Sequence, residues 1–265
     1  MSYVMGDKIT TDASADKPRP AGPPTLHGVD EGPRRSAGAR ANQRALREAI
    51  KGLIVERGMR PGAPLPTETE LMGELGVSRH PLREAMKALE AVGIVDIRHG
   101  YGTYVGSVPM SALEAGLAFR GALSVRGDFA DIRDLLEVRE AMETGLVPRV
   151  LAAYDDLDVG GLESAVSAME HAAERGRYAP DEDWRFHETL YRPLGNALVL
   201  DLLQVFWKVF QELDADLPRA DNTPEVTAAW HRTILEALRG RDETALRAAA
   251  VEHFRGIRTR VTPRA

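Results

Sequence analysis

Two short helical segments separated by a glycine turn constrain the fold of this chain more than any other feature. Thr67 and Glu70 have the spacing of a capping box, in which each side chain accepts a hydrogen bond from the other residue's backbone N–H. The helix that they begin ends at Gly76. Ser78 can then cap a second helix, with Pro81 in its first turn, where a missing backbone N–H costs little. Two such helices joined by a few residues form a helix-turn-helix.

The hydrophobic pattern changes from a helical to an alternating period directly after the second helix. Two β-prone runs, at 94–98 and 103–105, flank the glycine-bearing tip at 99–102, which indicates a hairpin. An amphipathic helical repeat at 46–54 precedes the helix pair. Helix, helix-turn-helix and hairpin in this order predict a winged helix-turn-helix, which we place at 39–106.

The pattern beyond the predicted wing is helical throughout. Asp158, Asn196 and Asp242 are suited to cap helices, because their short polar side chains accept hydrogen bonds from the first backbone amides. Short connections favour an antiparallel bundle, so we predict a mainly α protein whose residues 107–262 form an all-helical domain. The expected helices lie at 109–121, 130–154, 158–176, 180–193, 196–216, 223–239 and 242–260.

The composition separates a tail and two blocks of different charge. Residues 1–38 are rich in proline and glycine and poor in large apolar side chains, which predicts a disordered tail. Residues 40–105 carry 10 Lys/Arg and 8 Asp/Glu, a net charge of +2, whereas residues 106–265 carry 19 and 27, a net charge of −8. A mildly basic block is compatible with a DNA-binding N-terminal half.

The chain has no cysteine and no long run of apolar residues. The absence of cysteine excludes disulfides and thiolate metal sites and fits a reducing compartment. No stretch approaches the roughly 18 consecutive apolar residues that a membrane-spanning helix needs. We therefore expect a cytoplasmic protein that has no membrane partner.

The exposed residues at the start of the second short helix are candidates for reading DNA. A recognition helix places its first turns in the major groove, where an arginine can pair bidentately with guanine. Arg79 and Arg83 are four residues apart and so share a face with His80 between them. Ser78 can meet a phosphate at the helix N-terminus. At the tip of the wing, His99-Gly100 suits a backbone or minor-groove contact, because glycine permits close approach.

Three histidines and one aspartate of the C-terminal half point to the apolar side of their helices. Asp183 and His187 are four residues apart on one helix, while His231 and His253 align with the apolar stripes of the last two. A single inward histidine is more often a core residue, but a bundle can converge four such groups on one point. Three imidazoles and a carboxylate suit a divalent ion, zinc first, with nickel, manganese and iron as alternatives.

Arg139 lies on the inward stripe of the long helix at 130–154. A buried guanidinium needs an anionic partner. That partner is either Glu143, one turn further along, or the carboxylate of a bound ligand, which arginine recognises bidentately. The residues alone leave both alternatives open.

The N-terminal half contains the segments Leu65-Pro66-Thr67-Glu68, Val77 through Ala85, Leu89-Glu90, Gly93 and Gly100 through Val105. In these segments it resembles the DNA-binding domain of the GntR family of bacterial regulators. The resemblance implies that Arg79 and Arg83 contact bases and phosphates and that His99-Gly100 is the wing contact. Thr69 departs from the family, because many relatives carry a DNA-contacting arginine there, and this implies weaker affinity or a shifted half-site.

The C-terminal half contains the segments Leu136 through Arg139, Gly195-Asn196 and Gly240 through Asp242, together with the pattern Asp183, His187, His231 and His253. In these features it resembles the effector domain of the FadR subfamily, called FCD. The resemblance implies a metal site made by these last four residues and a homodimer. It also implies a small organic acid as effector, with Arg139 and Asn196 as candidate effector-binding residues.

The sequence therefore predicts a homodimeric regulator that binds an operator in double-stranded DNA and responds to a small carboxylate. By resemblance to the FadR subfamily, effector binding would release a repressor. Two alternatives to control by an acid are that the metal itself is the signal, or that the metal only stabilises the helical bundle. Enzymatic activity is a further hypothesis, since a metal ion with an open coordination position can activate water. No nucleophile motif or general base accompanies the ligands, so we expect no enzymatic activity.

Overall fold

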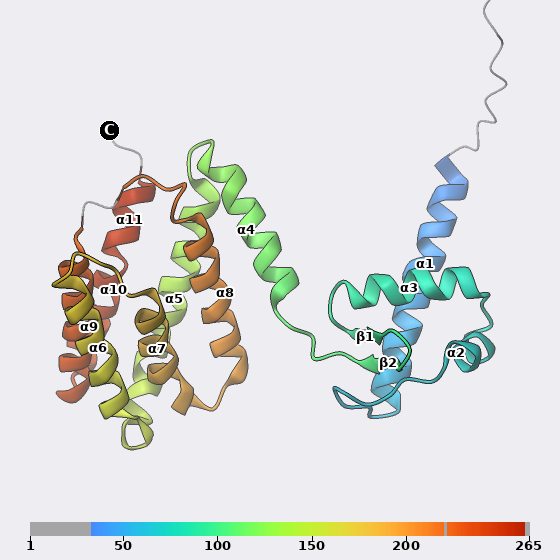
Figure 1. The fold of residues 1–265 in the computed structure, drawn as a ribbon, viewed down its shortest axis with the longest axis horizontal. Helices are drawn as coiled ribbons and strands as arrows, with labels where there is room; N and C mark the ends of the chain where they lie inside the picture. Colours follow the sequence, from blue (N-terminus) through green and yellow to red (C-terminus); the bar gives the residue numbers. More distant parts are fainter. Residues whose placement is uncertain (1–32, 220–221, 263–265) are drawn as a thin grey trace, which may run out of the picture.

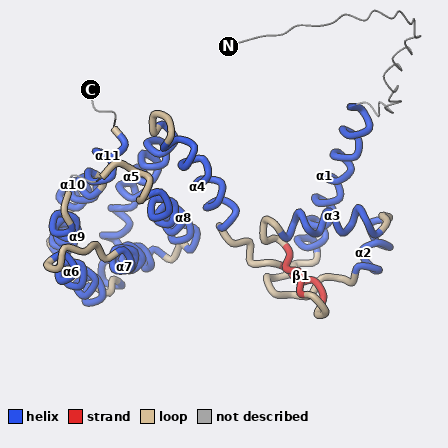
Figure 2. Tube along the Cα trace, turned by 45° about the horizontal axis from the view of Figure 1, so that its top comes forward, coloured by secondary structure: helices blue, strands red, loops and turns tan. Residues whose placement is uncertain are grey.

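The computed structural model describes residues 33–219 and 222–262, and their helices and strands form two groups (Figure 1). The two strands both belong to the N-terminal group, and the remainder is helical, as Figure 2 shows. This confirms a mainly α fold with a small hairpin. In the described part of the chain, no helix is both long and apolar enough to cross a membrane.

The N-terminal group is a winged helix-turn-helix. Its core is built from one side of each element, with Ile50, Leu71, Leu82 and Val95 all buried. The two strands are antiparallel, and Val95 lies opposite Val105. The elements are α1 (Pro33–Glu56), α2 (Glu68–Leu75), α3 (Arg79–Glu90), β1 (Val95–Arg98) and β2 (Gly102–Val105).

The helix-turn-helix forms for the reasons that the sequence suggests. The Thr67 backbone N–H donates to Oε2 of Glu70 at 2.7 Å, and the Glu70 N–H donates back to Oγ1 of Thr67 at 3.3 Å. α2 stops at Gly76, whose φ of 64° lies in the left-handed region. Gly106 ties the hairpin to the end of α3: a Cβ there would lie 2.0 Å from the carbonyl oxygen of Gly93. The base of the hairpin is therefore packed closely against the end of α3.

The predicted tail needs one correction. Residues 1–32 lie outside the described residues, but α1 already begins at Pro33, so the helix includes the last residues assigned to the tail. Proline is favoured in the first turn of a helix, because its missing N–H has no helical partner there. No further proline interrupts the chain before Pro61.

The C-terminal group consists of helices alone in the described residues. Asp158, Asn196 and Asp242 cap α6, α8 and α10 through their side chains, as predicted. Two short 3₁₀ turns, Tyr154–Asp156 and Arg192–Leu194, join successive helices. The helices are α4 (Ser111–Val125), α5 (Ala130–Ala152), α6 (Val159–Ala173), α7 (Pro180–Tyr191), α8 (Ala197–Leu213), α9 (Pro224–Arg239), α10 (Glu243–His253) and α11 (Arg255–Val261).

The prediction of one continuous final helix at 242–260 is wrong, because the helix is interrupted between α10 and α11. Phe254 occupies the break with its ring in the core. Gly256 follows immediately, and a Cβ there would lie 2.8 Å from Cζ3 of Trp230. Glycine weakens a helix and here permits a close approach to α9. The break leaves His253 at the end of α10.

Two apolar clusters hold the C-terminal helices together. One contains Leu162, Phe186 and Leu235 and joins α5 to α6, α7, α8, α9 and α10. The other contains Ile132 and Val209 and joins α4, α5, α8 and α11. Each such fully buried side chain stabilises the fold by about 1.5–3 kcal/mol. The facing sides of α7, α9 and α10 in the first cluster carry the histidines discussed next.

Candidate functional site

The first turns of α3 present the arginines singled out as candidates for reading DNA. Arg79, His80 and Arg83 are all exposed. Nε of Arg83 lies 2.9 Å from Oε1 of Glu68, the first residue of α2, and a second guanidinium nitrogen lies 3.2 Å from Oε2. Nε of Arg79 lies 3.4 Å from the same carboxylate. Glu68 thus holds both guanidinium groups over one face of the helix pair, and sequence reasoning gave it no role.

The remaining candidates for DNA contact lie around the same helices and the hairpin. Thr69 is exposed on α2. Ser78 is the N-cap residue of α3, and its hydroxyl makes no capping hydrogen bond, which leaves it available to a phosphate. His99 and Gly100 are exposed between β1 and β2, and Gly100 has a φ of 82°. This positive φ at the tip of the wing explains the glycine there.

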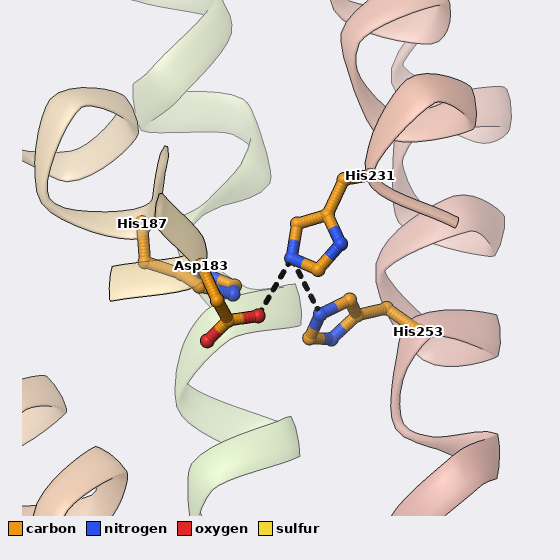
Figure 3. Close-up of side chains that lie close together, drawn as sticks. All are labelled: Asp183, His187, His231 and His253. Carbon is orange, nitrogen blue, oxygen red and sulfur yellow. Dashed lines mark hydrogen bonds and ion pairs between the residues drawn. The ribbon is translucent and has the colours of Figure 1, made fainter. Parts of the chain in front are cut away.

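Four potential metal ligands converge in the helical half (Figure 3). Asp183 and His187 come from α7, His231 from α9 and His253 from α10. One ligand atom of each lies within 4.8 Å of all the others. Oδ1 of Asp183 is 2.9 Å from Nε2 of His231, and Nε2 of His253 is 3.1 Å from the same nitrogen. The structure thus brings together all four residues that the sequence grouped.

Burial and neighbouring charges shift the pKa values of two of the four potential ligands. Burial and the neighbouring imidazoles hold the pKa of His253 well below its usual value, so its ring is neutral. Burial would raise the pKa of Asp183, but the contact with His231 outweighs it and keeps the pKa well below its usual range. Metal ions bind neutral imidazole and ionised carboxylate. His253 and Asp183 are therefore in the protonation states that a metal ion requires.

Surrounding groups orient the imidazoles. Nδ1 of His231 lies 2.9 Å from the carbonyl oxygen of Thr227, which leaves Nε2 directed at the cluster. His187 is fully buried, yet neither ring nitrogen has a hydrogen-bond partner; Nδ1 only approaches Oε2 of Glu143 at 3.3 Å. An unpartnered buried polar group costs about 1–3 kcal/mol. Coordination of a metal ion by one of these nitrogens would remove the cost at that atom, so the donor set fits a metal ion.

Arg139 and Glu143 form a buried ion pair on α5. Nε of Arg139 lies 2.7 Å from Oε1 of Glu143, and the hydroxyl of Tyr191 donates to Oε2 at 3.0 Å. Burial would raise the pKa of Glu143, but the positive charge of Arg139 outweighs this effect and holds the pKa well below its usual range. Of the two partners that the sequence left open for Arg139, Glu143 is the one in contact.

A cavity of about 730 Å³ adjoins the cluster. Arg139, Asp183 and His253 line one part of its wall. A guanidinium and two potential metal ligands thus face the same space. The rest of the wall includes aromatic side chains and further arginines: Tyr178, Trp230, Phe254, Arg177, Arg219 and Arg260.

Asn196 does not line this cavity, so its candidate role in effector binding is not supported by its position. Its side chain accepts a hydrogen bond from the backbone N–H of Val199 at 3.4 Å and caps α8. Sequence reasoning missed Tyr191 and Trp207, which contact Glu143 and Asp183. Tyr191 follows His187 by four residues, a spacing that could have revealed it. Trp207 gave no such signal, because the sequence pattern of neither helix shows that α7 packs against α8.

Comparison with known proteins places both halves in described families. Residues 42–105 match the family described as bacterial regulatory proteins, gntR family, and residues 134–256 match the FCD domain. The regulator YcbG of Bacillus subtilis (strain 168), described as an uncharacterized HTH-type transcriptional regulator, is 27% identical over 218 residues, 81% of this chain and 87% of that one. The putative transcriptional regulatory protein NedR of Micromonospora viridifaciens is 33% identical over 117 residues, 44% of this chain and 85% of that one. A solved structure, Streptococcus agalactiae GntR, aligns with a TM-score of 0.53 at 28% identity and covers 82% of this chain and 99% of that chain.

Proposed function

Because this chain belongs to the GntR family of bacterial regulatory proteins and carries an FCD domain, we propose that it is a repressor controlled by a small carboxylate. It is a transcriptional regulator with a DNA-binding domain, and its relatives are regulators rather than enzymes. The observation that carries the proposal is the convergence of Asp183, His187, His231 and His253 beside a cavity that Arg139 also lines. As a DNA-binding regulator it would act in the cytoplasm.

The proposed cofactor is a divalent metal ion held by those four residues. Three imidazole nitrogens and one carboxylate oxygen favour zinc, and nickel, manganese or iron would accept the same donors. The unpartnered ring of buried His187 supports a cation at this point rather than a polar core. When bound, the ion would supply a positive charge to one end of the cavity, where an acid's oxygens could reach it.

The proposed effector is a small organic acid. Asp183 offsets part of the charge of a divalent ion, and Glu143 already neutralises Arg139, so the occupied site would keep a net positive charge. Arg139 keeps further N–H donors, because a guanidinium has five and Nε donates to Glu143. The structure therefore supports recognition of a carboxylate between the ion and Arg139.

The proposed DNA contacts come from α3 and the wing. Arg83 and Arg79 would exchange their contact with Glu68 for guanine or phosphate, and Ser78 and His99-Gly100 would contact the backbone. Effector binding can lower operator affinity only by favouring the arrangement that binds DNA less well. Release of DNA by the acid is the direction that we propose.

A homodimer is part of the proposal. Phe119 and Leu123 are one turn apart on α4 and are 67% and 60% exposed. Exposed large apolar side chains of this kind mark interaction surfaces when they lie together. A twofold pair of chains would cover them and present two winged helices to a palindromic operator. Replacing Phe119 with glutamate should shift the sedimentation coefficient toward that of a monomer, and an unchanged coefficient would exclude this face.

A thermal-shift screen of small carboxylic acids tests the proposed function, with zinc-loaded and zinc-stripped protein run in parallel. A ligand at about 100 times its Kd stabilises the folded state by about 2.7 kcal/mol, a visible change in melting temperature. We expect an acid that acts only when metal is present. If metal raises the melting temperature and no acid changes it further, the result would instead favour a metal-sensing site or a purely structural metal site.

A further inference from the structure

The two carboxylate oxygens of Asp183 have different neighbours. Oδ1 faces the histidine cluster, at 2.9 Å from Nε2 of His231 (Figure 3). Oδ2 accepts a hydrogen bond from the indole Nε1–H of Trp207, with an N–O distance of 3.0 Å. Trp207 belongs to α8, a helix that contributes none of the four potential ligands. The carboxylate is therefore held between the cluster and a second helix.

A second tryptophan helps to fix Trp207 in this position. The ring of Trp184, the residue after Asp183, packs on that of Trp207, with centroids 5.8 Å apart and planes tilted by 47°. A tilted aromatic pair of this kind adds to the stabilisation that comes from burial of the two rings. Trp207 is half-buried where α8 faces α7, and its N–H donates to Oδ2 of Asp183 rather than to solvent.

A carboxylate can bind a metal ion through one oxygen or through both. The indole N–H is a donor only, so it engages a lone pair of Oδ2 without offering the ion a ligand of its own. We propose that Trp207 is a positioning residue that restricts Asp183 to binding the metal through Oδ1 alone. This inference rests on the proposed metal site and adds a reason why the site can accept an effector.

Restricting Asp183 to one oxygen preserves space around the ion. With one atom from each ligand residue, the protein supplies four donors. If the second oxygen of Asp183 also bound the ion, the protein would supply a fifth donor and one position fewer would be left for the acid. Trp207 would thus determine whether the metal has room for a ligand, although it touches neither the acid nor the cation.

Replacing Trp207 with phenylalanine keeps an aromatic ring and removes the N–H donor. Trp184→Phe is the matched control, because it makes the same change beside Trp207, keeps an aromatic ring packed on it and leaves the donor of the hydrogen bond to Asp183 in place. Each full-length protein is loaded with Co²⁺, whose visible absorption weakens as the number of ligands rises, and zinc affinity is measured by competition with a chelator. We expect Trp207→Phe to weaken the Co²⁺ band and to lower zinc affinity at least about tenfold, as loss of a group that orients a ligand usually does.

The outcomes separate this inference from the proposed function. A normal Co²⁺ band and normal zinc affinity in Trp207→Phe, equal to those of Trp184→Phe, would overturn the role of Trp207 and leave the metal site standing. Failure of the unmodified protein to bind either ion would overturn the metal site and this role with it. If Trp207→Phe does not fold, the indole ¹⁵N–¹H signals of the unmodified protein decide. Slow hydrogen exchange at Trp207 supports the bond to Asp183, and exchange as fast as in free tryptophan refutes it.

Discussion

Replacing Glu143 with alanine would leave the guanidinium of Arg139 buried without its carboxylate partner. The side chains of the two residues are 9% and 3% exposed, and Nε of Arg139 lies 2.7 Å from Oε1 of Glu143. The hydroxyl of Tyr191 would lose its acceptor as well. A charge left unpaired inside a protein is far more costly than the same charge at the surface.

The magnitude follows from this burial. Breaking a buried ion pair by removing one partner costs about 3–5 kcal/mol of folding free energy. Arg139 borders the cavity, so water can reach part of its guanidinium and reduce the cost. We therefore expect the free energy of unfolding to fall by about 3 kcal/mol, the lower end of the range.

Urea denaturation of the metal-free protein, followed by circular dichroism at 222 nm, measures this change. Glu163→Ala is the matched control, because Glu163 pairs with Arg232 and Arg239 while its side chain is 35% exposed. Such surface pairs contribute about 0–1 kcal/mol. If Glu143→Ala loses no more stability than Glu163→Ala, the buried pair on α5 does not stabilise the fold as described.

Three further predictions concern the DNA face, the metal site and the wing. Arg83→Ala should lower affinity for an operator selected from random duplexes about 10–100-fold in a gel-shift assay, with unchanged helical content, because a bidentate arginine–guanine pair contributes about 1–3 kcal/mol; unchanged binding would refute the recognition-helix assignment. The double variant His231→Ala, His253→Ala should lose bound metal in elemental analysis but remain dimeric in sedimentation, and retained stoichiometric metal would contradict the ligand assignment. Gly106→Ala should destabilise the winged helix by more than about 1 kcal/mol in thermal unfolding, because its Cβ would lie 2.0 Å from a backbone oxygen. Its control, Gly73→Ala in α2 with open space around it, should be neutral or stabilising, and equal behaviour of the two would refute the close approach.

The winged helix was predictable because its signals are local. A capping box, glycine turns and a change of hydrophobic period all act within a few residues of the structure that they specify. Thr67, Glu70 and Gly76 behave in the structure as their spacing predicts. The start of α1 at Pro33 was missed because a proline- and glycine-rich composition masked a favourable first helical turn.

The grouping of the four potential ligands was also accessible, because each lies on the inward stripe of its helix. What the sequence could not supply is which helices face one another. The contacts of Trp207 with Asp183, and of Glu68 with Arg79 and Arg83, join different helices and depend on packing that no periodicity encodes. The break at Phe254 was missed for a related reason, since the pattern on either side remains helical.

Control of operator binding by a metal-bound acid is tested most directly by the operator affinity of the full-length protein, measured by fluorescence anisotropy. Zinc-loaded and zinc-stripped protein are compared, each with and without the acid found in the thermal-shift screen. We predict that affinity falls only when metal and acid are present together, and that Arg139→Ala weakens this response. Equal affinity in all four conditions would refute control by the acid and leave the metal with a structural role only.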